Sequence, residues 1–424
     1  MNQKSDENSS VTVELPGAIV WSGRQAIERQ VSWPGPLNTP LGIAGFDAAQ
    51  HEIQQWAGYA ETPLVDLPAM AHAHGISRLA YKDEGERFTL KSFKALGGAY
   101  AVQRLLVEAI HAQQPDATVT TQALLDRQFQ SITEQMTVTC ATDGNHGRSV
   151  AWGAQQFGCR CVIYIHETVS EGRREAIAHY GAEVIRVDGN YDDAVRHAAQ
   201  AASSNGWTVV SDTSYEGYTD IPADVMHGYG VMAREVTSQW AGAPPTHVFV
   251  QAGVGAFAAA VCAVFWQHWG AQRPVFVLVE PSNAACCYES LKAGERVTIP
   301  GELDTIMAGL ACGEVSLLAW EVLRLGVDAC VVLDDEPVRH AMRQFARPPG
   351  SDKPIVSGET GAAGLAALSM IAASEKAREA ICLIPGARIL LLGSEGDTDP
   401  ALYEEIVGAN TGASVDSPQS RRLS

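Results

Sequence analysis

Lys94 stands in a setting that suits a lysine with a chemical role. It follows Phe93 and opens an apolar stretch of the chain. Desolvation in such surroundings lowers the pKa of an amine and favours its neutral form, which can form a Schiff base. Many lysines at the start of a helix are only solvated, so this segment alone leaves both covalent chemistry and an ordinary helix start open.

A second candidate is the polar turn between a β-prone run at residues 136–139 and a helix expected from about Gly147. The turn contains Thr142, Asp143, Gly144, Asn145 and His146. Backbone amides at the start of a helix suit the binding of a carboxylate. An Asx turn that caps the helix would explain the same residues equally well.

A glycine turn follows the strand expected at residues 247–251. It consists of Gly253, Val254, Gly255 and Ala256, and a helix of small residues comes next. Glycines let backbone amides approach a phosphate closely, and the helix dipole favours its charge. The turn lacks the lysine and hydroxyl of a P-loop and the spacing of a dinucleotide motif, so it predicts a small phosphorylated cofactor rather than ATP or NAD.

Ser394 follows a buried strand expected at residues 389–393. Its hydroxyl is suited to hydrogen-bond an uncharged ring nitrogen. A turn as rich in glycine and aspartate as this one would also occur without any ligand.

Short β-rich runs alternate with segments of helical period along most of the chain, which indicates βαβ units and a largely parallel sheet. The expected strands are 162–165, 183–187, 208–211, 247–251, 275–280, 329–333 and 389–393, and the clearest helices are 147–157, 171–180 and 192–203. Ligands in such folds collect at the carboxyl ends of the strands, and the polar turn, the glycine turn and Ser394 each follow an expected strand.

Three segments fall outside this alternation. Residues 1 to about 45 carry four prolines and are predicted to form an arm that lies over the rest of the protein. Residues 112–135 are polar and are predicted to form a surface helix and a loop. Residues 409–424 are small and polar and are predicted to form a mobile tail.

The composition is that of a metabolic enzyme. The chain has 424 residues, 46% of them hydrophobic, and 30 basic against 49 acidic residues give a net charge of −19. That charge repels phosphate backbones and anionic membranes, so neither nucleic acid nor a membrane is an expected partner. No apolar run approaches a membrane span and the first ten residues are polar, so we expect a cytoplasmic protein.

The nine cysteines lack paired CxxC spacing and lie mostly in apolar segments. Reduced, buried thiols are expected, and no metal is. A pairing of Cys286 or Cys287 with Cys312 is left open.

Together, and in this order, the four segments resemble the pyridoxal-phosphate enzymes of the tryptophan synthase β-subunit type, which include threonine dehydratase and cysteine synthase. The resemblance covers about residues 60–405. It narrows to the diaminopropionate ammonia-lyase family on five segments, which are residues 143–148, 251–256, 305–314, 357–362 and 395–399.

The resemblance implies an α/β fold of type II, with two open, twisted, mostly parallel sheets flanked by helices and the active site between a large and a small domain. It also implies a homodimer. We expect the large domain at residues 46–97 and 206–408, and the small domain at residues 98–205.

The resemblance implies how pyridoxal 5′-phosphate is bound. Lys94 holds it as a Schiff base, Phe93 packs beside its ring and Asn145 bonds its 3′-oxygen. Ser394 meets the ring nitrogen, Glu359 lies near the ring, and the phosphate lies on Gly253, Val254, Gly255 and Ala256. A serine in place of an aspartate leaves the ring nitrogen neutral, which favours rapid β-elimination.

The implied reaction converts D- or L-2,3-diaminopropionate into pyruvate and two molecules of ammonia. Lys94 is the expected base for the L-isomer, and Asp143, on the opposite face, for the D-isomer. Asp212 is expected to bind the distal ammonium, although it is equally suited to cap its turn. The substrate carboxylate is assigned to the turn of Thr142, Asp143, Gly144, Asn145 and His146.

Two alternatives remain. A serine, threonine or hydroxyaspartate dehydratase of the same fold would expel water, but two carboxylates at Asp143 and Asp212 suit a dicationic substrate better. A non-catalytic amino-acid sensor would not need Lys94. The sequence departs from the family pattern at Lys91 and Ser92, where a small polar pair is expected, and at Ser394, where threonine is expected.

Overall fold

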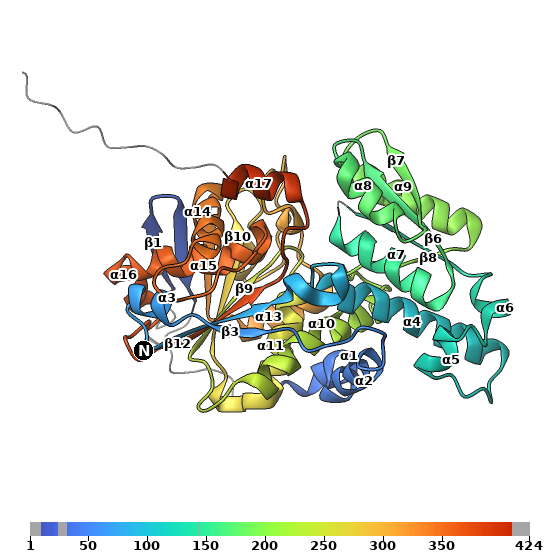
Figure 1. Ribbon diagram of the computed structural model, residues 1–424, viewed down its shortest axis with the longest axis horizontal. Helices are drawn as coiled ribbons and strands as arrows, with labels where there is room; N and C mark the ends of the chain where they lie inside the picture. The colour runs from blue at the N-terminus through green and yellow to red at the C-terminus, as the bar shows by residue number, and fades with distance from the viewer. Residues whose placement is uncertain (1–9, 24–31, 143, 409–424) are drawn as a thin grey trace, which may run out of the picture.

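The computed structural model describes residues 10–23, 32–142 and 144–408, and within them the chain forms two sheets with helices around them (Figure 1). The larger sheet has eight strands in the order β1-β2-β11-β10-β9-β12-β4-β3, and the smaller has four in the order β7-β6-β5-β8. The strands are β1 (Val11–Leu15), β2 (Ala18–Ser22), β3 (Leu64–Asp66), β4 (Arg78–Asp83), β5 (Thr137–Ala141), β6 (Arg160–His166), β7 (Glu183–Val187), β8 (Thr208–Val209), β9 (His247–Gln251), β10 (Val275–Pro281), β11 (Ala329–Leu333) and β12 (Arg388–Gly393).

The helices cover both sheets. They are α1 (Asn38–Leu41), α2 (Ile43–Ile53), α3 (Pro68–Ala73), α4 (Lys94–Gln113), α5 (Thr121–Leu125), α6 (Gln130–Thr133), α7 (Asn145–Phe157), α8 (Glu171–Ala178), α9 (Tyr191–Asn205), α10 (Asp220–Gln239), α11 (Ala256–Trp269), α12 (Cys286–Ala293), α13 (Leu317–Gly326), α14 (Asp335–Ala346), α15 (Glu359–Ala372), α16 (Glu375–Ala380) and α17 (Pro400–Gly408). Short 3₁₀ segments lie at Gly35–Leu37, Glu84–Thr89, Gly270–Gln272 and Ala308–Leu310.

The central strands of the large sheet are buried on both faces, as their near-continuous apolar sequences require. In β9, Val248 and Val250 join the core formed with α2, α10, α11 and α13. Phe249 points the other way, into the core formed with α3, α14, α15 and α16. The strands β11, β10, β9, β12 and β4 run parallel to one another. Strand β2 pairs antiparallel with β11, β3 pairs antiparallel with β4, and β1 forms the edge beyond β2.

The small sheet is parallel throughout. Val162 and Tyr164 of β6 pack with the alanines of α9, whereas Ile163 and Ile165 belong to the core that contains α7. Helix α4 starts beside the large sheet and packs against both α10 and α7, so it joins the two domains (Figure 1).

The expected fold class is confirmed, and the strand ranges at residues 183–187, 247–251 and 329–333 coincide with β7, β9 and β11. Strand β8 is shorter than the expected run and belongs to the small sheet, just past the expected domain boundary at residue 205.

The N-terminal segment differs from the arm predicted for residues 1–45. Residues 11–22 form a hairpin that pairs antiparallel with β11 and so extends the large sheet, because the edge of β11 offers unpaired backbone groups. The predicted tail, 409–424, lies outside the described residues. No helix in the described part of the chain is long and apolar enough to cross a membrane.

Candidate functional site

The candidate residues come together where parallel strands of both sheets end. Ser394 follows β12 and the glycine turn follows β9, while Thr142 follows β5 and Asp212 lies shortly after β8. Lys94 Nζ contacts Asp212 Oδ2, and the backbone amide of Phe93 donates to the carbonyl oxygen of Ser394 at 3.0 Å.

Lys94 is presented by a strained loop. Three residues just before it, Phe88, Thr89 and Lys91, have positive φ angles of 48°, 63° and 58°, a conformation that costs energy for residues other than glycine. A hydrogen bond fixes the loop near its end, because the Gly396 amide donates to the Lys91 carbonyl oxygen at 2.9 Å. Lys94 then opens α4 as its first residue. Strain of this kind is typical of functional sites.

The electrostatics of Lys94 differ from the expectation. Burial alone lowers the pKa of this amine, but the Asp212 carboxylate and the Tyr229 hydroxyl outweigh burial and raise it above its ordinary value. The expected lowering was wrong because a carboxylate 118 positions away in the chain pairs with the lysine. Burial favours the neutral form of Asp212, yet Lys94 and His146 hold its pKa below the usual range.

Phe93 is buried and stacks within a group of rings. Its centroid lies 4.1 Å from that of Phe257 and 4.7 Å from that of Tyr229. Lys94 Nζ lies 5.5 Å from the centre of the Phe93 ring, so the aromatic face borders the lysine that follows it.

The glycine turn has the geometry expected of an anion site. Gly255 has φ +87°, which favours glycine, and a side chain at Gly253 would come within 2.9 Å of Cys312 Sγ and of the Gly309 carbonyl oxygen. The amides of Gly253, Val254 and Gly255 have no acceptor among the described residues. Together with the first turn of α11 they can bind a phosphate.

Ser394 is buried, and its hydroxyl accepts a hydrogen bond from Gln251 Nε2 at 2.9 Å. The same amide group also donates to the carbonyl oxygens of Thr360 and Leu392 at 3.0 and 2.7 Å. Because its oxygen already accepts from Gln251, the serine can donate its own proton to an acceptor in the site.

The polar turn after β5 caps α7. Thr142 Oγ1 accepts from the amides of Gly144 and Gly147, both at 3.1 Å. Asn145 Nδ2 donates to Glu395 Oε2 at 2.5 Å, which connects the small domain to the large one, and His146 Nε2 lies 2.8 Å from the Val210 carbonyl oxygen. Asp143 lies outside the described residues.

Acidic side chains gather beside this turn. Burial, and next the charge of Glu395, raise the pKa of Glu359 to about 8. Arg173 of α8 offsets part of this negative charge, with Nη2 3.8 Å from Glu359 and Nε 3.4 Å from Asp399. Arg173 is therefore a second small-domain residue that reaches the large domain at the site.

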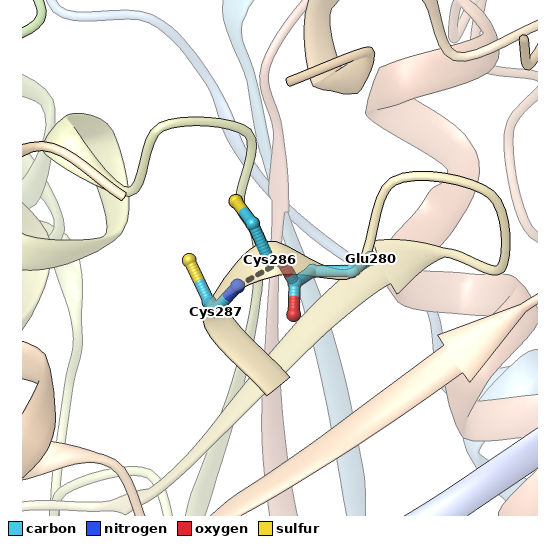
Figure 2. A group of neighbouring side chains, drawn as sticks. All are labelled: Glu280, Cys286 and Cys287. Carbon is cyan, nitrogen blue, oxygen red and sulfur yellow. Dashed lines mark hydrogen bonds between the residues drawn. The ribbon is translucent and has the colours of Figure 1, made fainter. Parts of the chain in front are cut away.

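Glu280, Cys286 and Cys287 form a buried group (Figure 2). It lies next to the glycine turn, since both thiols donate to the Gly253 carbonyl oxygen at 3.6 Å. Their possible ligand atoms lie within 4.8 Å of one another, and burial raises the pKa of Glu280 to about 8. The two carboxylate oxygens already accept from the amides of Cys287 and Tyr288 at 2.8 and 2.7 Å, so the group also has a structural role at the start of α12. All nine cysteines are free, so no disulfide joins Cys286 or Cys287 to Cys312.

Four residues at the site had not been selected from the sequence. Tyr229 and Arg173 lie within helices and had no local signal, since only the tertiary fold brings them to the site. Gln251 and Glu395 lie inside two of the segments that carry the resemblance, and their position next to Gly253 and Ser394 was an available signal.

Comparisons with known proteins agree with this geometry. A family model described as pyridoxal-phosphate dependent enzyme matches residues 55–386. Diaminopropionate ammonia-lyase of Escherichia coli strain K12 is 42% identical over 359 residues, which cover 84% of this chain and 89% of the relative. The chain belongs to the diaminopropionate ammonia-lyase family.

Two crystal structures of diaminopropionate ammonia-lyase from Escherichia coli are similar to this one. The complex with D-serine has a TM-score of 0.83 at 38% identity and covers 92% of this chain and 96% of its own. The complex with an aminoacrylate-PLP azomethine reaction intermediate has a TM-score of 0.82 at 37% identity and covers 94% of this chain and 98% of its own.

The residues of this chain fit pyridoxal phosphate, the cofactor of the family. The amides of the glycine turn suit its phosphate, and Ser394 can donate to its ring nitrogen. Lys94 is the amine at the meeting point of the two domains, and Phe93 presents an apolar surface next to it.

Proposed function

We propose that this protein is a pyridoxal-phosphate-dependent ammonia-lyase that converts 2,3-diaminopropionate, as the D- or the L-isomer, into pyruvate and two molecules of ammonia. The observation that carries the proposal is the contact of Lys94 with Asp212 in a chain of this family. The pair combines a lysine for the cofactor with a carboxylate for a substrate that bears a second ammonium group.

We assign the cofactor contacts as follows. Lys94 holds it covalently, Phe93 packs beside the ring, Asn145 bonds the 3′-oxygen, and Ser394 donates to the ring nitrogen. Gly253, Val254, Gly255 and Ala256 bind the phosphate, and Glu359 lies near the ring. When bound, pyridoxal phosphate supplies the electron sink that makes the α-proton of the substrate acidic.

The residues of the chain then handle charge and protons. Lys94 Nζ takes the α-proton of the L-isomer, for which it must be neutral at that moment. Asp212 binds the β-ammonium group, which leaves as ammonia. The turn of Thr142, Asp143, Gly144, Asn145 and His146 holds the substrate carboxylate at the start of α7. The amides of Asn145 and His146 are its donors, because those of Thr142 and Gly144 already donate to the Tyr164 carbonyl oxygen and to Thr142 Oγ1.

For the D-isomer, we assign the α-proton to Asp143. This assignment rests on the sequence. If it is right, Asp143→Asn lowers kcat for D-diaminopropionate far more than for L-diaminopropionate. An equal loss with both isomers would refute the division.

The competing function is a dehydratase of the same fold. The related Escherichia coli enzyme has been crystallised with D-serine, so hydroxy amino acids belong in the test. Pyruvate and 2-oxobutyrate release should be measured with D- and L-diaminopropionate, serine, threonine and hydroxyaspartate. We expect the highest kcat/KM with diaminopropionate, and a value no better than that for serine would reject the proposal.

A homodimer and a cytoplasmic location are also part of the proposal. The homodimer rests on the family resemblance, and sedimentation equilibrium tests it. The location rests on composition and charge.

A further inference from the structure

Tyr229 lies at the centre of the site, although the assignments above give it no role. It belongs to α10 and is fully buried. Its hydroxyl donates to Asp212 Oδ2 at 3.3 Å, and Lys94 Nζ lies 5.3 Å from the centre of its ring. The phenol thus contacts the carboxylate that pairs with the lysine.

The fold gives this ring a fixed place. Helices α4 and α10 cross so closely that a side chain at Gly228 would come within 2.3 Å of the Leu96 carbonyl oxygen. A side chain at Gly97 would come within 2.3 Å of Tyr229 Cε1. The ring also packs edge-on against Phe93, with centroids 4.7 Å apart. Two glycines and an aromatic neighbour therefore position the hydroxyl.

The need for such a group follows from the charge of Lys94. A lysine that accepts a proton must first be neutral, and Asp212 then has no counter-charge until the second ammonium group of the substrate reaches it. A buried carboxylate without a counter-charge tends to take up a proton. A hydroxyl that donates to the carboxylate opposes this and favours the ionised form.

We propose that Tyr229 is a positioning residue that keeps Asp212 ionised and in place while Lys94 is neutral, so that the site continues to select a substrate with a second ammonium group. This inference rests on the proposed function, because it takes Lys94 as the cofactor lysine and Asp212 as the partner of that ammonium.

Among the described groups around Asp212, only Tyr229 and His146 can keep its carboxylate ionised while Lys94 is neutral. Lys94 faces it from α4 and His146 from α7, and both lower its pKa. The thiol of Cys140 in β5 and the hydroxyl of Tyr218 also face it, but burial raises the pKa of each, so both stay neutral. On α11 the neighbour of Tyr229 is the apolar Phe257. With Lys94 neutral, Tyr229 and His146 are the groups on these elements that favour the anion.

The first test is a spectrophotometric pH titration of the purified holoenzyme, which follows the visible band of the lysine-bound cofactor. Lys94 Nζ and the Tyr229 hydroxyl both contact Asp212 Oδ2, so a hydroxyl that keeps this carboxylate ionised also keeps a negative charge beside the lysine nitrogen. Tyr229→Phe keeps the ring and removes the hydroxyl, so the midpoint should move to lower pH by about half a unit to one unit.

Tyr59→Phe is the matched control, because the Tyr59 hydroxyl also donates to a buried carboxylate, Glu235 Oε1, at 3.0 Å. We expect no shift in this variant. A titration of Tyr229→Phe that coincides with that of the wild type overturns the inference.

The second test compares substrates. In Tyr229→Phe the ratio of kcat/KM for diaminopropionate to that for serine should fall about three- to tenfold, since only diaminopropionate needs the charge on Asp212. Asp212→Asn should lower the ratio further, and the double variant should match Asp212→Asn, because Tyr229 acts through Asp212. An equal loss with both substrates, or additive losses in the double variant, overturns the inference.

The two proposals fail in different ways. If the wild type releases no pyruvate from diaminopropionate but Tyr229→Phe shifts the titration, the proposed substrate is wrong. The effect of the Tyr229 hydroxyl on the pair of Lys94 and Asp212 is then supported. If the wild type is active and the titration does not move, the proposed function is kept and the role of Tyr229 is rejected.

Discussion

Two groups of charged side chains flank the loop that leads to Lys94, and they are built differently. Behind the loop, Lys82, Glu84, Arg87 and Glu235 are all buried, with two positive and two negative charges. At the site, the side chains of Lys94 and Asp212 are 19% and 16% exposed. Glu359 and Asp399 share the single cation of Arg173 there.

The buried group is closed. Arg87 donates to both carboxylates at 2.8 Å, and Lys82 Nζ donates to Glu235 Oε2 at 2.6 Å and to the Thr62 carbonyl oxygen at 2.7 Å. No charge is left for a ligand, so this group fixes the strained loop. The site is open, because Lys94 and Asp212 are partly exposed and Glu359 and Asp399 share one cation, Arg173, so it can bind a cationic substrate. The two groups therefore differ in charge balance and in exposure, and this difference separates a structural role from a functional one.

The largest effect is expected for Lys94→Ala. Without the amine that holds the cofactor and takes the proton, kcat should fall by at least about 10³-fold. The visible cofactor band should disappear, and a cooperative thermal unfolding transition should show that the variant still folds. Activity within tenfold of the wild type would show that this lysine does not do the chemistry.

Glu235→Gln tests the closed group. It keeps the shape of the side chain but leaves Arg87 and Lys82 with one excess buried charge, which should lower the free energy of unfolding by about 3 kcal/mol or more. Urea unfolding followed by fluorescence measures it. Glu321→Gln is the control, because the Glu321 side chain is 39% exposed in its pair with Arg324. Equal stability of the two variants would contradict the distinction between the two groups.

The same contrast explains what the sequence predicts and what it does not. The glycine turn, Ser394 and the turn after β5 are local patterns at strand ends, so their place in the site follows from βαβ order. Local patterns at strand ends do not predict that Asp212 pairs with Lys94, and they do not predict the buried group of Lys82, Glu84, Arg87 and Glu235. Asp212, Tyr229 and Glu235 reach the loop through contacts between elements far apart in the chain, and no local spacing encodes them. The lowered pKa expected for Lys94 failed for that reason.

Arg173→Gln should have an intermediate effect. Arg173 links α8 to Glu359 and Asp399, so its loss removes two contacts between α8 and the large domain at the site. Because small displacements of binding groups are costly, kcat/KM should fall about three- to tenfold. Arg173 also lowers the pKa of Glu359, so the variant should raise that pKa further above about 8.

The control for Arg173 is its neighbour in α8. Arg174 pairs with Glu171 on the same helix. Among the described residues it forms no ion pair with the large domain. Arg174→Gln should leave kcat/KM unchanged. If both variants lose activity equally, the effect comes from the charge of the helix and not from the contact between domains.

The smallest effect is expected for Lys91→Ala, three residues before Lys94. Lys91 Nζ pairs with Asp397 at 2.8 Å, but its side chain is 43% exposed and that of Asp397 is 26% exposed. Exposed pairs contribute about 0–1 kcal/mol, so stability should change within that range and kcat should stay close to that of the wild type. Steady-state kinetics at low and high salt measures this. A tenfold loss of kcat would mean that the site depends on the exposed pair of Lys91 and Asp397 as strictly as the fold depends on the buried group. The distinction between the two groups would then be wrong.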